Sequence, residues 1–380
     1  MSQEQPPVDA AVDRDPDARL EDGIALCLSG GGYRAMLFHA GALIRLNEMG
    51  VLPRIARFSS VSGGSIAAAK LALAWPRLAF DARGVSPRLF DLVIDPLRGM
   101  ASRTIDASSV AVGALWFGSV GDRLAGAYDK HLFEGATLQD LPGAPRFVFN
   151  ATNVQSKALW RFSKPYMRDW RVGEVRNPDL RLAVAVAASS AFPPFLSPVE
   201  IEVDPRSFTP GSGADLQRPP YTSNIILTDG GVYDNLGLET AWKRYRTLWV
   251  SDGGGGYDDE PDPKRDWAHH SLRVLSLIDN QVRSLRKRQL MAAFKSKERA
   301  GRYWSAFDDI AGLPCPDKLP CDFEPAAGLA RVATRLKSME PELQERLMNL
   351  GYAICDASLR SFDDPVTGAP PPKFPFDRGV

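Results

Sequence analysis

The sequence predicts an α/β protein with three layers, in which helices cover both faces of a mostly parallel central sheet. Residues 23–75 alternate between short apolar runs, typical of buried strands, and a longer run with helical spacing. Further short apolar runs occur at residues 225–229 and 248–251. Strands that alternate with helices in this way form parallel sheets joined by right-handed crossovers.

The first strand signal is the continuous apolar run of residues 23–28. A glycine-rich stretch, Ser29 to Gly32, follows at once, and residues 33–49 then carry apolar side chains at helical spacing. Gly50 is well placed to end that helix. The chain therefore opens with a strand, a glycine loop and a helix.

Residues 60–64, Ser-Val-Ser-Gly-Gly, follow the next strand signal and precede a helix-like run. A nucleophile elbow is a sharp strand-to-helix turn that holds a serine hydroxyl above a sheet, and its usual pattern is G-x-S-x-G. Here Ser60 replaces the first glycine, so the match is incomplete, and Gly63 and Gly64 alone also fit a plain loop. The pattern makes Ser62 a candidate nucleophile.

The glycine loop itself indicates an anion site. Between a strand and a helix, the amides of Gly30, Gly31 and Gly32 point at one spot, where the helix dipole adds positive potential. A Walker A loop is excluded because no Lys-Ser or Lys-Thr follows, and Ala35 replaces the last glycine of the dinucleotide pattern, although an alanine variant of it exists. The elbow one crossover later favours an oxyanion hole. A tight turn without a ligand is the simpler alternative.

A second decisive stretch is the buried strand signal that ends in Asp229, followed by Gly230 and Gly231. An aspartate at the C-terminal end of a strand lies on the edge where open α/β sheets bind ligands. Asp-Gly pairs also cap turns, which is the alternative without a catalytic role.

A serine nucleophile needs a general base. None of the four histidines follows a strand end after the nucleophile, where a Ser-His-Asp triad of an α/β hydrolase would place its base; they are His39, His131, His269 and His270. Asp229 is the better candidate, because a buried carboxylate with a tuned pKa can take the serine proton directly.

The middle of the chain adds further elements. Residues 76–145 predict helical insertions around the sheet rather than a separate domain. Residues 146–153 form a strand that ends in polar groups, with residues 159–162 as its hairpin partner.

A long helix is predicted over residues 272–295, and a further helix over residues 336–359. The long helix carries a basic group, namely Arg283, Arg286, Lys287 and Arg288. Such a face is usually only solvated, and contact with anionic lipid headgroups is the alternative.

The length of 380 residues suits one large domain or two modest ones, and we expect a single domain over residues 21–362, between a disordered leader (1–20) and a Pro-rich tail (363–380). The net charge of zero gives no indication of a nucleic-acid partner. No apolar run reaches the roughly 18 residues of a transmembrane helix, and no signal peptide is visible. We expect a cytoplasmic protein whose membrane contact, if any, is peripheral.

The cysteines show no metal-ligand spacing, and no metal or other cofactor is expected. Cys27 lies in an apolar strand and is expected to be a buried thiol. Cys315 and Cys321 are close enough in sequence for a disulfide, but free thiols in a reducing cytosol fit better.

Three motifs in this order resemble the patatin-like phospholipase family. They are the segment Leu28 to Ala35 (Leu-Ser-Gly-Gly-Gly-Tyr-Arg-Ala), the elbow at Ser62, and Asp229 with the two glycines after it. The glycine loop also resembles the cytosolic A-type phospholipases. The resemblance covers roughly residues 23–240.

The resemblance implies a patatin-like fold and a lipid acyl hydrolase. The enzyme would cleave carboxylic esters of phospholipids or lysophospholipids at a membrane or micelle surface. By position, Ser62 is the nucleophile, Asp229 the base, and Gly30 to Gly32 supply the oxyanion-hole amides. Arg34 matches the family's basic residue, which meets a phosphate headgroup or steadies the loop.

A further segment, Ala188 to Ala191, resembles one that lies near the family's active site. The departures are Ser60 for the elbow's first glycine and Ser29 where plant-type members have aspartate. A strained backbone angle at residue 60 would cost a serine more than a glycine. Two other classes compete with the hydrolase: a catalytically silent lipid-binding or regulatory module with the same fold, and a nucleotide-binding α/β protein.

Overall fold

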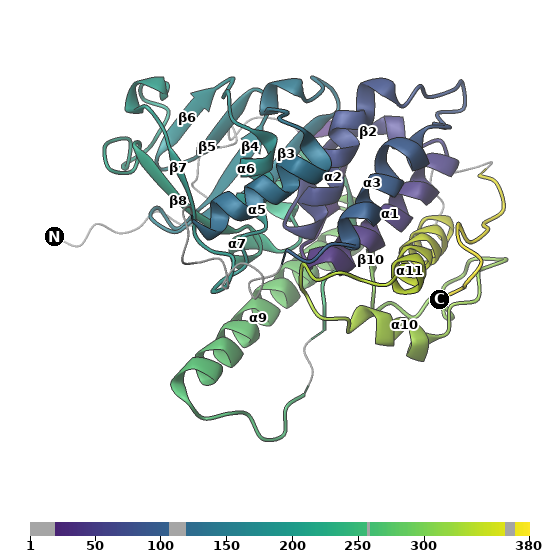
Figure 1. Ribbon diagram of the computed structural model, residues 1–380. Coiled ribbons are helices and arrows are strands. Elements are labelled where there is room, and N and C mark those ends of the chain that lie inside the picture. The colour runs from purple at the N-terminus through teal and green to yellow at the C-terminus, as the bar shows by residue number, and fades with distance from the viewer. Residues whose placement is uncertain (1–19, 106–118, 257–258, 362–368) are drawn as a thin grey trace.

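The computed structural model describes residues 20–105, 119–256, 259–361 and 369–380. Nearly all of the predicted leader lies outside the described residues. The described chain contains a 10-stranded sheet with helices packed around it (Figure 1). Within these ranges, no helix combines the length and apolarity needed to cross a membrane.

The central part of the sheet is parallel, in the order β10-β9-β1-β2-β3. Its strands are β1 (Glu21–Leu28), β2 (Ile55–Ser60), β3 (Arg146–Asn153), β9 (Tyr245–Asp252) and β10 (Ala300–Ser305). This confirms the predicted mostly parallel core, and β1, β2, β3 and β9 begin or end within a few residues of the predicted runs, whereas β10 was not predicted.

The remaining strands are antiparallel, and they extend the sheet beyond β3. They are β4 (Ala158–Ser163), β5 (Tyr166–Asp169), β6 (Gly173–Arg176), β7 (Val199–Glu202) and β8 (Asn224–Asp229). The pairing of β3 with β4 is the predicted hairpin.

Helices lie on both faces of this sheet. They are α1 (Gly32–Glu48), α2 (Gly63–Ala74), α3 (Asp95–Ala101), α5 (Val120–Tyr128), α6 (Leu182–Ser189), α7 (Gly231–Asp234), α8 (Leu238–Trp242), α9 (Trp267–Lys295), α10 (Phe323–Ala330) and α11 (Pro341–Arg360). Alternate residues of β1 divide the two faces: Leu26 and Leu28 enter the large core with α1, α2 and α11, while Ala25 and Cys27 enter a smaller core with α8 and α9. This confirms the three-layer arrangement.

β8 differs from the central strands in its direction, which was not predicted from the sequence. In the structure β8 runs antiparallel to β3, with Asp229 opposite Ala151. A short strand after a long connection carries no sequence signal for its direction, because its residues point alternately to the two faces either way.

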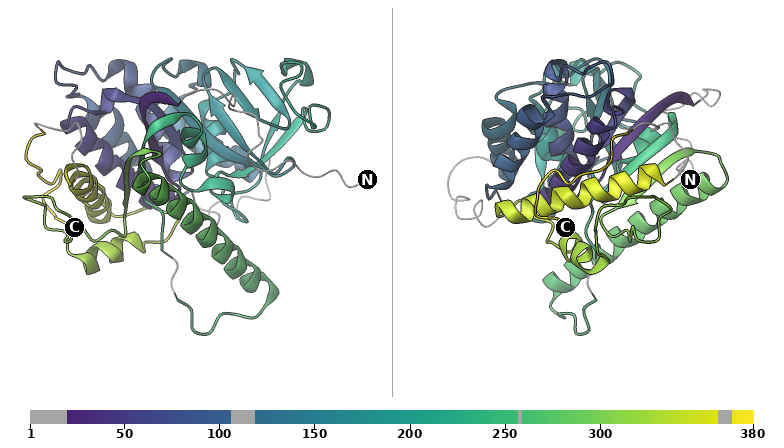
Figure 2. Two further views of the ribbon diagram at one scale, coloured as in Figure 1. Left: turned by 180° about the vertical axis from the view of Figure 1, so that it is seen from behind. Right: turned by 90° about the vertical axis from the view of Figure 1, so that its right-hand side faces the viewer.

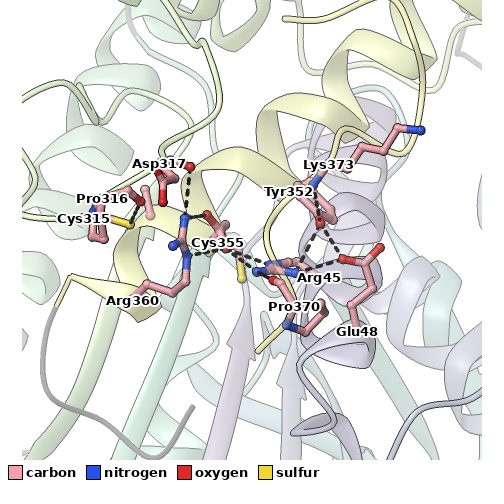
Figure 3. A network of polar contacts seen from close by, with 12 residues as sticks. Arg45, Glu48, Cys315, Pro316, Asp317, Tyr352, Cys355, Arg360, Pro370 and Lys373 are labelled. Carbon is pink, nitrogen blue, oxygen red and sulfur yellow. Dashed lines mark hydrogen bonds and ion pairs between the residues drawn. The ribbon is translucent and has the colours of Figure 1, made fainter. Parts of the chain in front are cut away.

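The four cysteines are free thiols, and Cys27 is buried as expected. Arg45 of α1, whose side chain is fully buried, joins α1 to α11 (Figure 3). Its guanidinium donates to Asp356 at 2.8 Å, to Glu48 at 3.0 Å and to the carbonyl of Pro370 at 2.8 Å. The described part of the Pro-rich tail, 369–380, is thereby held against both helices, although it contains no helix or strand.

This network predicts a large stability effect for Asp356→Ala. The substitution leaves the Arg45 charge buried without its main carboxylate, so we expect the free energy of unfolding to fall by about 3 kcal/mol. Urea denaturation followed by circular dichroism measures it. The control is Asp22→Ala at the exposed Arg246 pair, which should leave stability nearly unchanged. Equal effects of the two substitutions would contradict this role for Asp356.

Candidate active site

Residues between β2 and α2 form the strand–turn–helix unit that the sequence predicts. Ser62 lies at its tip with φ 52° and ψ −122°, a conformation that residues other than glycine rarely adopt. Its amide donates to both the carbonyl and the hydroxyl oxygen of Ser189, each at 3.1 Å. Strain of this kind at a single serine on a strand-to-helix turn is typical of a nucleophile elbow.

The two glycines after Ser62 are required by close packing. A β-carbon at Gly63 would lie 2.1 Å from the carbonyl oxygen of Gly32, and one at Gly64 would lie 2.4 Å from that of Leu28. The first turn of α2 therefore rests directly on the glycine loop. Any larger residue at either position would separate the two turns.

Ser60, the departure from the elbow pattern, carries no left-handed strain. It closes β2 opposite Phe149, and the positive φ falls on Ser62 instead. The Ser60 hydroxyl accepts a hydrogen bond from the Ser65 hydroxyl at 3.0 Å. The Ser65 hydroxyl in turn lies 2.8 Å from the Ser189 hydroxyl. A serine at position 60 thus contributes to a buried chain of hydroxyls that a glycine would lack.

The glycine loop lies beside the elbow. A β-carbon at Gly30 would be 3.2 Å from that of Ser62. The Gly30 amide already donates to the carbonyl of Asn235 at 3.0 Å, so its hydrogen is engaged. Gly31 and Gly32 have φ values of 142° and 58°, and neither amide donates to a backbone acceptor within the described ranges.

Arg34 points away from the elbow. Its guanidinium donates to the carbonyl of Gly253 at 3.1 Å, to the carbonyl of Val332, and to the hydroxyl of Thr334 at 3.0 Å, and the residue is 1% exposed. These contacts tie two later loops to the glycine loop. Of the two roles expected for Arg34, steadying the loop fits this placement and a phosphate contact does not.

Asp229 reaches the elbow because β2 and β8 pair with the same edge of β3. Ser60 of β2 lies opposite Phe149, and Asp229 of β8 lies opposite Ala151. Because β2 is parallel and β8 antiparallel to β3, the two strands run toward each other along this edge and their ends meet. Asp229 is 2% exposed, and its Oδ1 accepts from the Gly231 amide at 2.7 Å. No well-formed hydrogen bond reaches Oδ2 from the described residues.

The environment of Asp229 shifts its proton affinity. Burial raises its pKa to about 7, while the hydrogen bond from the Gly231 amide and the nearby Ser62 hydroxyl oppose the rise, and the Asp279 carboxylate adds to it. Within the described residues, no well-formed hydrogen bond joins the Ser62 hydroxyl to this carboxylate. Near neutral pH the group exchanges a proton readily, as a general base must.

The histidines have other roles. His39 is buried, with Nδ1 2.9 Å from the Ser251 hydroxyl and Nε2 2.9 Å from the Ser29 carbonyl, and burial lowers its pKa to about 4. His269 contacts Asp266 on the surface at 2.9 Å. Within the described residues, no hydrogen bond joins a histidine ring to Ser62.

Sequence reasoning missed Asn235, which joins the two motif loops. Its carbonyl accepts from Gly30, and its Oδ1 lies 2.8 Å from where a β-carbon at Gly231 would stand. The signal in the sequence that could have identified Asn235 was its position six residues after Asp229. Ser189 had a signal in the segment 188–191, and its contacts with Ser62 place that segment at the elbow.

The fold and this elbow define a class, the α/β proteins that present a serine on a strand-to-helix turn above the sheet. A family model described as patatin-like phospholipase matches residues 26–242. The match covers more than half of the chain, which therefore belongs to the patatin-like phospholipase family. Membership supports lipid hydrolase activity. A search of curated proteins found no match.

Solved structures of phospholipases and effectors are similar at low identity. Human GIVD cytosolic phospholipase A2, in complex with a fluorophosphonate inhibitor and terbium chloride, is 14% identical over 88% of this chain and 58% of its own, with a TM-score of 0.47. VipD from Legionella pneumophila is 15% identical over 89% and 66%, with a TM-score of 0.37. The chain thus spans between about half and two thirds of the length of these structures.

The backbone strain at Ser62 predicts that Ser62→Gly is more stable than Ser62→Ala. Glycine adopts a positive φ without steric penalty, whereas alanine keeps the strain, so the free energies of unfolding should differ by about 1 kcal/mol. Chemical denaturation of both variants measures the difference. An alanine variant as stable as the glycine variant would show that the turn is unstrained.

The buried carboxylate predicts that Asp229→Asn stabilises the protein at high pH. Because the pKa of Asp229 in the folded state, about 7, is above the ordinary value of 3.8, this group's contribution to stability is present at low pH and is lost as pH rises through 7. The melting temperature of Asp229→Asn minus that of wild type should therefore grow between pH 5 and pH 8. A difference that is constant with pH would contradict the raised pKa.

Proposed function

We propose that the protein is a serine esterase that cleaves carboxylic esters of phospholipids or lysophospholipids through a dyad of Ser62 and Asp229. The observation that carries the proposal is the placement of a strained, elbow-borne serine beside a buried carboxylate whose pKa is raised to about 7. Membership of the patatin-like phospholipase family supports the lipid substrate class.

In this mechanism the Asp229 carboxylate takes the hydroxyl proton as the Ser62 Oγ attacks the ester carbonyl carbon. The tetrahedral intermediate collapses when the ester C–O bond breaks, and protonated Asp229 gives its proton to the leaving alcohol. Water then attacks the acyl-enzyme with Asp229 again as base, which releases the fatty acid and restores Ser62. Each step returns the carboxylate to the ionisation state that the next step requires.

The structure supports a smaller set of oxyanion donors than the three glycines named from the sequence. The Gly30 amide is engaged by Asn235, so the amides of Gly31 and Gly32, beside the elbow, are the better candidates to hold the negative oxygen. Asn235 acts through Gly30 as a positioning residue, since it keeps the loop at a fixed distance from Ser62.

The domain and location are part of the same proposal. Residues 21–362 act as one hydrolase domain, since α1 and α11, near its two ends, pack together around Arg45. A cytoplasmic location with peripheral membrane contact fits the free thiols.

Hydrolysis assays test the dyad. Wild type should cleave a short fluorogenic ester and phospholipid vesicles, and Ser62→Ala and Asp229→Asn should each lose at least about 10³-fold in kcat/KM because nucleophile or base is missing. Ser207→Ala, on an exposed turn, is the matched control and should keep full activity. Undiminished activity in either dyad variant excludes the dyad.

A fluorophosphonate probe distinguishes an enzyme from a silent module. The probe should label wild type and Ser207→Ala but not Ser62→Ala, because it reacts only with an activated serine hydroxyl. If wild type is folded and neither labelled nor active on either ester, the chain is a catalytically silent lipid-binding module.

The rate should depend on pH through Asp229. Only the ionised carboxylate accepts the serine proton, so kcat/KM for the soluble ester should fall below an apparent pKa near 7 and level off above it. A profile measured from pH 5 to 9 checks this. A plateau that extends unchanged to pH 5 would be inconsistent with Asp229 as the base.

A further inference from the structure

Helix α9 leaves the body of the protein with little packing around it. It runs from Trp267 to Lys295, and its buried residues are Leu290 and Ala293, both in the last two turns. Figures 1 and 2 show the rest of the helix projecting away from the sheet. The projecting part, residues 267–285, is about 27 Å long at 1.5 Å per residue.

The outward face of this projecting part is apolar. The exposed large hydrophobic residues on it are Trp267, Val274, Leu275, Leu277, Ile278 and Leu285, with exposed fractions between 39% and 84%. At about 100° per residue they fall within an arc roughly 160° wide, which the polar residues His270, Ser271 and Gln281 interrupt. We call this the outer face of α9. It is wider than the a/d seam of a helix pair.

Three of the four basic residues singled out on α9 turn toward the body of the protein, whereas the fourth, Arg288, is exposed. Arg283 pairs with Asp252 at 3.2 Å, and Arg286 pairs with Glu239 at 2.6 Å. Lys287 lies over the ring of Tyr303, 4.4 Å from its centroid. These three cations hold the helix to β9, α8 and β10, so most of the cationic group seen in the sequence has a structural use inside the molecule.

A second set of exposed hydrophobic residues lies on segments next to the candidate site. We call it the rim: Val154, Phe192, Phe195 and Val232, each between 47% and 58% exposed. Val154 follows β3, and Val232 lies three residues after Asp229. The two phenylalanines follow Ala191, whose carbonyl accepts from the Asp229 amide. Phe192, Phe195 and Val232 therefore follow residues at the candidate dyad, and Val154 follows the strand that pairs with β8.

One rim residue lies on an element that contacts α9. α7, which contains Val232, packs against α9. Asp279 of α9 is close enough to act electrostatically on Asp229. Of the exposed large hydrophobic residues among the described ones, only Phe90 and Phe323 lie on neither α9 nor the rim. Exposed large hydrophobic side chains are thus concentrated on α9 and on segments next to the candidate site, as expected of a surface that receives a lipid substrate.

We propose that the outer face of α9 and the rim insert together into the headgroup layer of a zwitterionic phospholipid surface and so deliver lipid to Ser62. This inference rests on the proposed function. A second copy of the chain fits less well, because it would use a narrow helical seam and leave the rim unexplained. A strongly anionic surface also fits less well, because the loop before Trp267 carries more carboxylates than cations, namely Asp259, Glu260, Asp262 and Asp266 against Lys264 and Arg265.

The test is co-sedimentation with phosphatidylcholine vesicles, using full-length protein in the Ser62→Ala background so that the vesicles stay intact. The Ser62→Ala protein should bind at 0.15 M and equally at 1 M NaCl, since apolar insertion is not screened by salt. Ile278→Glu and Phe195→Glu should each lower the partition coefficient at least about tenfold, because a charge replaces an inserted side chain. Phe323→Glu, an equally large change on α10, is the control and should stay within about twofold.

Three results would overturn the proposal. They are absence of vesicle binding, equal binding by all variants, and binding that appears only with anionic vesicles and disappears in high salt. Analytical ultracentrifugation adds a fourth: a dimer that Ile278→Glu dissociates, with vesicle binding unchanged, would assign the outer face to a second copy. Circular dichroism of each variant confirms that it is folded.

The outcomes separate this inference from the proposed function. Vesicle binding by Ser62→Ala does not require catalysis, and hydrolysis of the soluble ester by wild type does not require a surface. Binding without ester hydrolysis would support the lipid surface and remove the dyad. Hydrolysis of the soluble ester without vesicle binding would support the dyad and exclude the lipid surface.

Discussion

The candidate site depends on a close contact between two backbone turns. The first turn of α2 rests on the carbonyls of Leu28 and Gly32, at distances that leave no room for a β-carbon at Gly63 or Gly64. This contact sets the separation between Ser62 and the loop amides, and the hydrogen bond from Gly30 to Asn235 also holds the end of α7 against the loop. Arg34 secures the other side of the glycine loop through three acceptors on later segments. Backbone packing of this kind is more rigid than side-chain packing, as an oxyanion site requires.

The register of β3 is the second determinant. β2 and β8 approach each other along one edge of this strand and end opposite Phe149 and Ala151. This pairing brings Ser62 and Asp229, which are far apart in the sequence, close together without a long loop. A slip of one residue in either pairing would turn Ser62 or Asp229 to the opposite face. The neighbouring antiparallel strands, which bury Trp160 and Phe162, stabilise that register.

Both proposed catalytic residues are held in unfavourable states. Ser62 has a backbone conformation suited to glycine, and Asp229 is a carboxylate in a buried site. The surrounding structure maintains them, with the large core on one side and the Arg45–Asp356 pair joining α1 to α11. Stability elsewhere thus permits local strain at the site, a common trade-off in enzymes. The exposed apolar area of α9 and the rim is unfavourable in water in the same sense, and a lipid surface would relieve it.

Much of this protein could be predicted from its sequence, because the signals are local. The apolar run of β1, the helical spacing of α1 and the glycines at 30–32 and 63–64 each depend on a few neighbouring residues, and they indicated the parallel core and Ser62 as the candidate nucleophile. The tertiary structure alone decided what depends on distant contacts. It showed the antiparallel direction of β8, the short strands β5, β6, β7 and β10, the engagement of Gly30 and Arg34, and the strain at Ser62 rather than Ser60. It also showed that Arg283, Arg286 and Lys287 of α9 face inward and that large apolar residues of the helix face outward, since which face of a helix is covered depends on segments far away in the chain.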